Sequence, residues 1–150
     1  MEISNKTIEV LKRAGWYEGR KIDITENLKF LEERGFYVLD SAKSFMEEFG
    51  ELKINVEEIL KDGTKSISKH TTCIKETVGI LDNRHFNLDK HYNREKVMVI
   101  GALYDFGTDL YISESGRIFD SIGWIGDSTW EAFDNIINEK GTIIWDKFKG

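Results

Sequence analysis

Two residues with chemical potential, His70 and Cys73, lie three positions apart in the middle of the chain. Imidazole and thiolate are metal ligands, so this spacing would supply half of a zinc site, with His85 or His91 as further candidates. A structural zinc site uses four ligands, often as two closely spaced pairs, and the sequence contains one such pair. We therefore predict no metal site and interpret the histidines as loop or surface residues.

A catalytic role is also weakly supported by the sequence. Cys73 is the single cysteine, so no intramolecular disulfide is expected, and no motif surrounds it that would mark a thiol nucleophile. Asp105-Phe106-Gly107 matches a metal-binding tripeptide of protein kinases, but the other kinase motifs are missing. Asp105 and Asp109 also lack the alternating ligands of a calcium loop, so a turn between strands is expected. We predict a protein that is not an enzyme, with no catalytic residue, no cofactor and no small-molecule substrate.

Net charge limits the partners that the chain can bind. The sequence has 27 acidic and 21 basic residues, a net charge of −6. The excess lies in the second half, with 8 basic against 13 acidic residues in 76–150, compared with 13 against 14 in 1–75. Acidic surfaces repel phosphate backbones and attract basic partners, so nucleic acid is not an expected ligand. No signal peptide and no long apolar run is present, which predicts a cytoplasmic protein with no membrane partner.

Three short amphipathic helices are predicted in the first third of the chain. Their apolar residues recur every three or four positions, and a glycine follows each helix as a C-cap. Asp23 or Thr25 is expected to cap the second helix, and Asp40-Ser41 to cap the third. The predicted helices cover residues 7–14, 24–34 and 42–49.

The remainder of the chain predicts strands followed by a closing helix. Asp62-Gly63 and Glu114-Ser115-Gly116 are hairpin-turn signals, and Asp127 or Ser128 is expected to cap the last helix, which runs to about Lys140. Strands are predicted over residues 52–56, 64–67, 97–103, 110–113 and 117–121, with irregular loops and one short helix, near 75–81, in the weakly patterned segment 68–94. The order predicts an α+β fold: a single domain over 1–150, with a mainly antiparallel sheet packed by helices at both ends of the chain.

Glycines and aromatics recur at positions that read as fold-making motifs. The residues are Gly15, Trp16, Gly19, Arg20, Phe49, Gly50, Gly116 and Gly126. In order and spacing these motifs resemble the SUKH superfamily of immunity proteins, and most closely its third branch. The resemblance spans nearly the whole chain, from the first predicted helix to the last.

The resemblance implies a function as well as a fold. The expected protein is bacterial, since members of the superfamily are typically encoded beside secreted polymorphic toxins, many of them nucleases or nucleic-acid deaminases. They bind the cognate toxin inside the producing cell and neutralise it, and they carry no catalytic residues. The alternative is an intracellular adaptor or scaffold protein of the same fold.

A partner-binding patch can be proposed from the acidic second half of the chain. A toxin that acts on nucleic acid needs a basic substrate groove, which an acidic surface would fill and occlude. Trp124 fits either a core residue or an apolar anchor on that surface. The predicted contact residues are Asp105, Asp109, Glu114, Asp120, Trp124 and Asp127.

Overall fold

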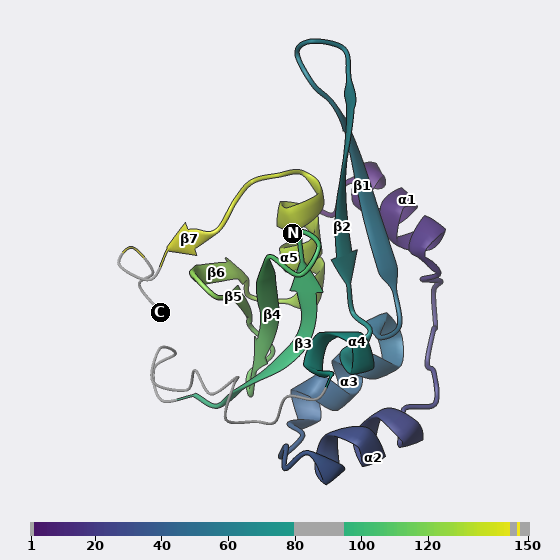
Figure 1. The fold of residues 1–150 in the computed structure, drawn as a ribbon, viewed down its shortest axis with the longest axis vertical. Coiled ribbons are helices and arrows are strands. Elements are labelled where there is room, and N and C mark those ends of the chain that lie inside the picture. Colours follow the sequence, from purple (N-terminus) through teal and green to yellow (C-terminus); the bar gives the residue numbers. More distant parts are fainter. Residues whose placement is uncertain (1, 80–94, 145–146, 148–150) are drawn as a thin grey trace.

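A curled antiparallel sheet of seven strands dominates the computed structural model, which describes residues 2–79, 95–144 and 147 (Figure 1). Five helices accompany the strands within these residues, and the fold is a single α+β domain, as the sequence predicts. The helices are α1 (Asn5–Ala14), α2 (Thr25–Glu33), α3 (Asp40–Phe49), α4 (Ile74–Val78) and α5 (Thr129–Ile137). The strands are β1 (Lys53–Ile59), β2 (Lys65–Thr71), β3 (Val97–Leu103), β4 (Thr108–Ser113), β5 (Ile118–Asp120), β6 (Gly123–Gly126) and β7 (Ile143–Ile144).

The strands follow one another across the sheet in chain order, and each pairs antiparallel with the next. β1 and β2 pair along their whole length, from Lys53 opposite Thr71 to Ile59 opposite Lys65. β2 meets β3 at one registered pair, Thr71 with Ala102. The β1–β2 hairpin therefore projects beyond the rest of the sheet, as its long teal arm shows in Figure 1.

Local capping explains where several helices begin and end. The Ser4 hydroxyl accepts the Thr7 N–H at 3.2 Å to start α1, and the Ser128 hydroxyl accepts the Glu131 N–H at 3.2 Å to start α5. Gly15 closes α1 with a left-handed φ of 118°, a conformation that costs glycine little. The predicted caps at Gly15 and Ser128 are confirmed.

The cap predicted for α3 is wrong. Leu39 occupies the N-cap position without a side-chain hydrogen bond, and Asp40 lies inside the first turn. The Ser41 hydroxyl donates instead to the carbonyl oxygen of Ser113 at 2.7 Å, so it links α3 to the end of β4. A carboxylate in the first turn still interacts favourably with the helix dipole, which explains why Asp40 is tolerated there.

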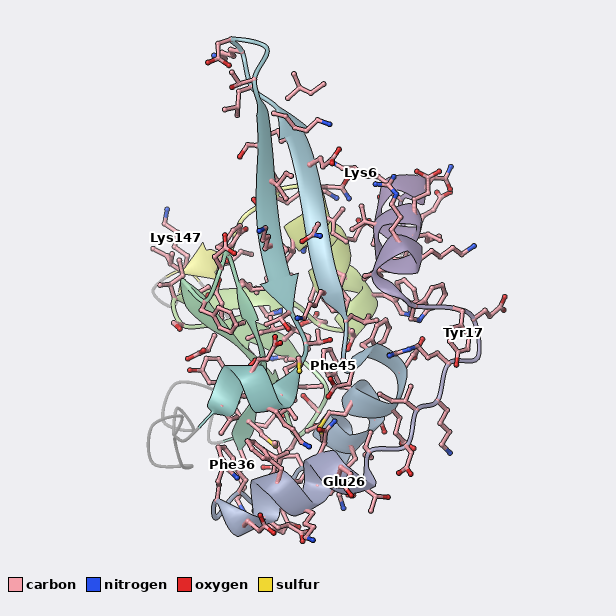
Figure 2. All side chains as sticks on the ribbon, turned by 45° about the vertical axis from the view of Figure 1, so that its right-hand side comes forward. Lys6, Tyr17, Glu26, Phe36, Phe45 and Lys147 are labelled. Carbon is pink, nitrogen blue, oxygen red and sulfur yellow. The ribbon has the colours of Figure 1, made fainter. Side chains whose placement is uncertain are left out.

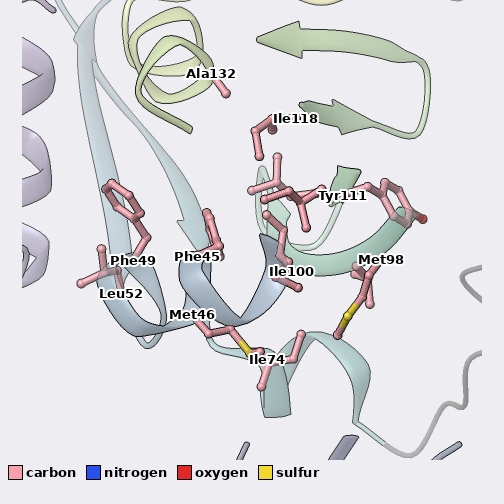
Figure 3. Close-up of a cluster of buried hydrophobic side chains, with 14 of the residues drawn as sticks. Phe45, Met46, Phe49, Leu52, Ile74, Met98, Ile100, Tyr111, Ile118 and Ala132 are labelled. Carbon is pink, nitrogen blue, oxygen red and sulfur yellow. The ribbon is translucent and has the colours of Figure 1, made fainter. Parts of the chain in front are cut away.

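The hydrophobic core lies between the helices and the sheet (Figure 3). The rings of Phe45, Phe49 and Phe133 join α3 to α5, with centroids of Phe49 and Phe133 5.4 Å apart. Ile112 of β4 and Ile118 of β5 are buried in the same cluster. Helices from the two ends of the chain thus share one core. None of the described helices is long and apolar enough to cross a membrane.

Strands β6 and β7 and the end of strand β2 were not predicted from the sequence. β6 begins and ends with glycine, a poor strand former, but a Cβ at Gly123 would lie only 2.0 Å from the Ile143 carbonyl oxygen of β7. The segment expected to be irregular from residue 68 is instead ordered as the end of β2 and as α4, as far as Val78. The short predicted helix near 75–81 corresponds to α4, and the rest of that segment, residues 80–94, lies outside the described residues.

Candidate protein-binding surface

His70 and Cys73 have separate partners in the structure. His70 is 4% exposed, and its Nδ1 accepts the Tyr104 N–H at 3.1 Å, so the prediction of a surface or loop position is wrong for this histidine. The Cys73 thiol donates to Glu51 Oε2 at 3.1 Å. Among the described residues no three potential metal ligands gather in one place, and His85 and His91 lie outside those residues.

Protonation states at these two residues follow from burial. Burial lowers the pKa of His70 to about 4, so the ring is neutral at pH 7 and Nδ1 can accept a hydrogen bond. Burial also raises the pKa of the Cys73 thiol, which keeps it protonated at neutral pH. A protonated thiol is a weak nucleophile, and the geometry assigns both residues a structural role.

The predicted acidic residues do not form one patch, because β4 separates them. Asp105 and Asp109 lie at the β3–β4 turn, whereas Glu114 follows the other end of β4. The five residue steps between Thr108 and Ser113, at about 3.4 Å each, place the two ends of β4 roughly 17 Å apart. Asp127 follows β6 close to the Glu114 end, because Gly126 pairs with Ile118. The residues therefore belong to opposite ends of the sheet.

Asp120 was predicted to contact the partner, but the structure places it inside the protein. It is 4% exposed, and its Oδ1 accepts the N–H groups of Ile122 and Gly123 at 2.9 and 3.0 Å. Its Oδ2 accepts the Thr142 hydroxyl at 2.7 Å. Since both oxygens are engaged inside the protein, Asp120 shapes the β5–β6 turn and is not available to a partner.

Glu114, Trp124 and Asp127 also make contacts within the protein. Glu114 Oε1 accepts the Lys96 N–H at 2.8 Å, and Asp127 Oδ1 accepts Trp124 Nε1–H at 2.9 Å. Asp127 lies 3.4 Å from Arg117 Nε as well, and Trp124 is half-buried against the core. The two carboxylates remain exposed, but their charge and the indole N–H are already partly satisfied at this end of the sheet.

The other end of the sheet has a feature that the sequence did not reveal. Tyr104, Asp105 and Phe106 are consecutive non-glycine residues with left-handed φ angles of 52°, 54° and 66°. Left-handed backbone costs about 1 kcal/mol or more for each such residue. The turn nevertheless holds Tyr104 48% exposed and Phe106 59% exposed. A strained turn thus presents two aromatic side chains to solvent.

Exposed apolar side chains continue onto the projecting hairpin. Ile59 is 74% exposed at the end of β1, Leu60 is 44% exposed in the turn, and Ile67 is 45% exposed on β2. Exposed aliphatic and aromatic side chains gathered at one end of a protein mark candidate interaction sites. We call the corner of the sheet that carries Tyr104, Phe106 and Ile67 the hairpin corner.

The fold-making motifs lie elsewhere and meet one another in space. Trp16 Nε1–H donates to Glu48 Oε2 at 3.0 Å, and the Arg20 guanidinium donates to the Glu48 carbonyl oxygen at 2.6 Å. The Trp16 and Trp130 rings meet edge-on, with centroids 5.0 Å apart. A Cβ at Gly126 would lie 2.5 Å from the Ala132 nitrogen, so only glycine lets β6 approach α5 this closely.

The other motif glycines have local roles. Gly19 and Gly116 have φ angles of 82° and 92°, in turns where a side chain would strain the backbone. A Cβ at Gly50 would lie 2.5 Å from the Met46 carbonyl oxygen, where the chain leaves α3. Phe49 is 3% exposed in the core. The predicted motif positions therefore hold the fold together.

The exposed apolar corner is a candidate site for binding another macromolecule, whereas the α+β fold by itself does not determine a function. Comparison with protein families identifies the particular group. The chain belongs to the SUKH-3 immunity protein family, whose model matches residues 3–139, from before α1 to just beyond α5. This confirms the resemblance drawn from the motifs. The family indicates a toxin-neutralising immunity function and is generally non-enzymatic. Comparisons with curated proteins and with solved structures found no significant match.

Proposed function

We propose that the protein binds one cognate toxin domain inside the bacterial cell that makes it, and neutralises that domain by covering its active site. Membership of the SUKH-3 immunity protein family is the observation that carries this proposal. We further propose that the toxin is a nuclease or a nucleic-acid deaminase. The basis for this second statement is electrostatic.

Charge supports a nucleic-acid-directed toxin. A domain that binds a phosphate backbone needs lysine and arginine in its substrate groove, and an acidic protein is complementary to such a groove. The chain has a net charge of −6, and Asp105 is exposed between the two exposed aromatics Tyr104 and Phe106. An apolar anchor beside a carboxylate provides affinity and steering together.

The hairpin corner is the preferred contact surface, with Asp105 and Asp109 as its acidic residues. Both lie at this end of the sheet, and Asp109 is half-buried, with the Tyr111 hydroxyl 3.4 Å from its Oδ2. Glu114 and Asp127 stay as proposed secondary contacts, because each carboxylate already accepts a hydrogen bond within the protein at the opposite end of the sheet. The proposal therefore places the main interface on one side of the molecule.

The decisive experiment pairs the chain with the toxin domain encoded in the neighbouring reading frame. Cells that express the toxin domain alone should die, and co-expression of the chain should restore growth. The purified toxin domain should cleave or deaminate nucleic acid, and an equimolar amount of the chain should abolish the reaction. If the chain neither protects cells nor binds the toxin domain, the proposal is wrong and an adaptor role is favoured.

A further inference from the structure

Within the residues that the structure describes, the β1–β2 hairpin has an open edge on its β2 side. β2 extends from Lys65 to Thr71, but its registered pairing with β3 is limited to Thr71 with Ala102. Beyond this pair the chain leaves β3 through the turn that starts at Tyr104, so the outer half of β2 projects past its neighbour (Figure 1). A strand edge without a neighbour presents backbone groups that can pair with another chain.

The hydrogen-bond pattern shows which backbone groups face this edge. Residues in an antiparallel pair alternate between bonding to each other and facing away. Leu60 N–H donates to the Thr64 carbonyl oxygen at 2.8 Å across the hairpin, so by alternation Ser66 and Ser68 bond to β1. Lys69 faces the other way, since its carbonyl oxygen accepts the Asp105 N–H at 2.8 Å.

Ile67 and Lys65 lie two and four residues before Lys69 in the same strand. Their N–H and C=O groups must therefore point to the same side as those of Lys69, away from β1. The Asp105 N–H therefore continues the β2 ladder by one hydrogen bond, after which the ladder stops. Ile67 and Lys65 offer the next donors and acceptors to solvent. A segment in extended conformation can add to the sheet at this point.

The left-handed turn places one aromatic on each face of the open edge. The Tyr104 ring packs against His70, with ring centroids 4.7 Å apart, on the face shared by Ser66 and Ser68. Phe106 lines the opposite face, where a hollow of about 150 Å³ also contacts Lys69 and the end of β2. An added strand would therefore have an apolar surface beside it on both faces.

Two carboxylates flank the edge on the Tyr104 side. Glu58 of β1 and Glu139, just after α5, approach closely enough that their hydrogen bond raises the pKa of Glu139. Neither carboxylate forms a salt bridge within the part of the chain that the structure describes. Lys65, by contrast, is already bound by Glu57 at 3.5 Å. Lys6 is the basic residue that interacts with Glu139, so the two carboxylates leave the Tyr104 face of the edge net negative, and this face complements a basic segment.

We infer that an extended, lysine- or arginine-bearing segment of the toxin domain pairs with the β2 edge at Lys65–Ile67. Tyr104 and Phe106 cover its two faces, and Glu58 with Glu139 binds its basic side chains. This inference rests on the proposed function and specifies how that function is performed. Lys65 and Lys69 lie on the Phe106 face, so the basic side chains of the added segment point to the opposite, Tyr104 face. Pairing between two copies of the hairpin is disfavoured, because their lysines would meet.

Amide hydrogen exchange tests the pairing directly. The probe is the inactive toxin domain from the neighbouring reading frame, mixed with the isotope-labelled chain. Exchange of the Lys65 and Ile67 amides should slow by at least about tenfold in the complex. The Ser66 and Ser68 amides, already bonded to β1, serve as internal controls and should change little. A complex in which Lys65 and Ile67 exchange as fast as in the free chain overturns the inference.

A pair of variants provides a second, independent measurement. Ile67→Pro deletes an N–H that β1 does not use, whereas Ile67→Thr keeps the N–H and removes the apolar side chain. We expect Ile67→Pro to weaken toxin binding by at least about tenfold and Ile67→Thr to weaken it less. Tyr17→Ser is the matched surface control, since Tyr17 is 56% exposed and lies on the α1–α2 link, away from the hairpin (Figure 2).

The outcomes separate the inference from the proposed function. If the wild-type chain binds and neutralises the toxin while Ile67→Pro does so equally well, edge pairing is wrong and the immunity function stands. If the wild-type chain does not bind the toxin at all, both are overturned. Should Ile67→Pro fail to fold, the exchange experiment on the wild-type chain still decides the question.

Discussion

Trp16 and Trp130 meet edge to face, with ring centroids 5.0 Å apart and ring planes at 89°. The two residues follow α1 and begin α5, so the contact joins the first and last helices of the chain. Trp130 also packs edge-on against Phe49 at 5.4 Å, which brings in α3. Three motifs that are far apart in the sequence thus form one aromatic contact.

Replacing Trp16 should reveal how much this contact stabilises the fold. Trp16→Ala removes the ring and its hydrogen bond to Glu48, and should lower the free energy of unfolding by about 3 kcal/mol. Trp16→Phe keeps an aromatic ring but loses the hydrogen bond, so about 1 kcal/mol is expected. Urea unfolding measures both, with Tyr17→Ala as the exposed control. Equal effects of Trp16→Ala and Tyr17→Ala would contradict the assigned role.

A buried hydrogen bond joins the same two ends of the chain. The Thr7 hydroxyl donates to Asp134 Oδ1 at 2.7 Å, and the Ser4 N–H donates to the same oxygen at 3.1 Å. Thr7→Val keeps the shape but leaves the buried carboxylate with one donor fewer, at a cost of about 2 kcal/mol. Thr25→Val is the control, because its hydroxyl donates to exposed Asp23 at 2.6 Å. A loss of stability in thermal unfolding no larger than that of Thr25→Val would refute this assignment.

Elements governed by local chemistry were predictable from the sequence. Gly15 and Ser128 determine helix ends through their own backbone and hydroxyl groups, so the residue type alone was sufficient. β6 was missed because Gly123 and Gly126 are poor strand formers. Glycine is required at these positions because the backbone approaches β7 and α5 too closely for a side chain. That requirement comes from contacts between distant segments, which a local pattern does not contain.

The candidate site was harder to predict than the fold. Asp120 looked like a surface carboxylate, but its register opposite Leu110 turns it inward, where backbone N–H groups bind it. A turn between strands was expected around Asp105, but its left-handed backbone, which exposes Tyr104 and Phe106, was not. Side-chain direction depends on register and turn geometry, so composition identified the charge of the surface and not its location.

His70 should make stability depend on pH in a specific window. Burial lowers its pKa from an ordinary value of 6.5 to about 4, an effect that nearby Asp105 only partly opposes. Between these values the unfolded chain binds a proton that the folded chain does not, so the free energy of unfolding falls as the pH falls from about 6.5 to about 4. The full effect of this residue is about 3 kcal/mol.

His70→Asn isolates that contribution. An asparagine oxygen can accept the Tyr104 N–H in place of Nδ1, and it does not titrate. Both proteins are unfolded by denaturant at several pH values. The contribution of the shared carboxylates to the pH dependence cancels in the difference between their free energies of unfolding. The stability of the wild type should decline relative to the variant below about pH 6.5. Parallel curves for the two proteins would show that His70 titrates normally in the folded state.

The charge of the hairpin corner should control how fast the toxin domain associates. Asp105→Asn with Asp109→Asn removes two negative charges, and asparagine tolerates the left-handed backbone at residue 105 better than lysine would. The association rate constant at low salt should fall about threefold to tenfold, with a flatter dependence on salt, because steering acts through long-range charge. Stopped-flow fluorescence with the purified toxin domain measures both quantities.

The matched control removes the same net charge from the opposite end of the molecule. Glu26 and Glu33 lie on α2, and Figure 2 shows Glu26 far from the projecting hairpin. If the corner faces the toxin, Glu26→Gln with Glu33→Gln should change the association rate less than the aspartate pair does. Salt at about 0.1 M ionic strength screens interactions between charges that are more than about 10 Å apart. Equal slowing by both pairs would mean that only the total charge of the chain matters, and Asp105 and Asp109 would then have no place in the interface.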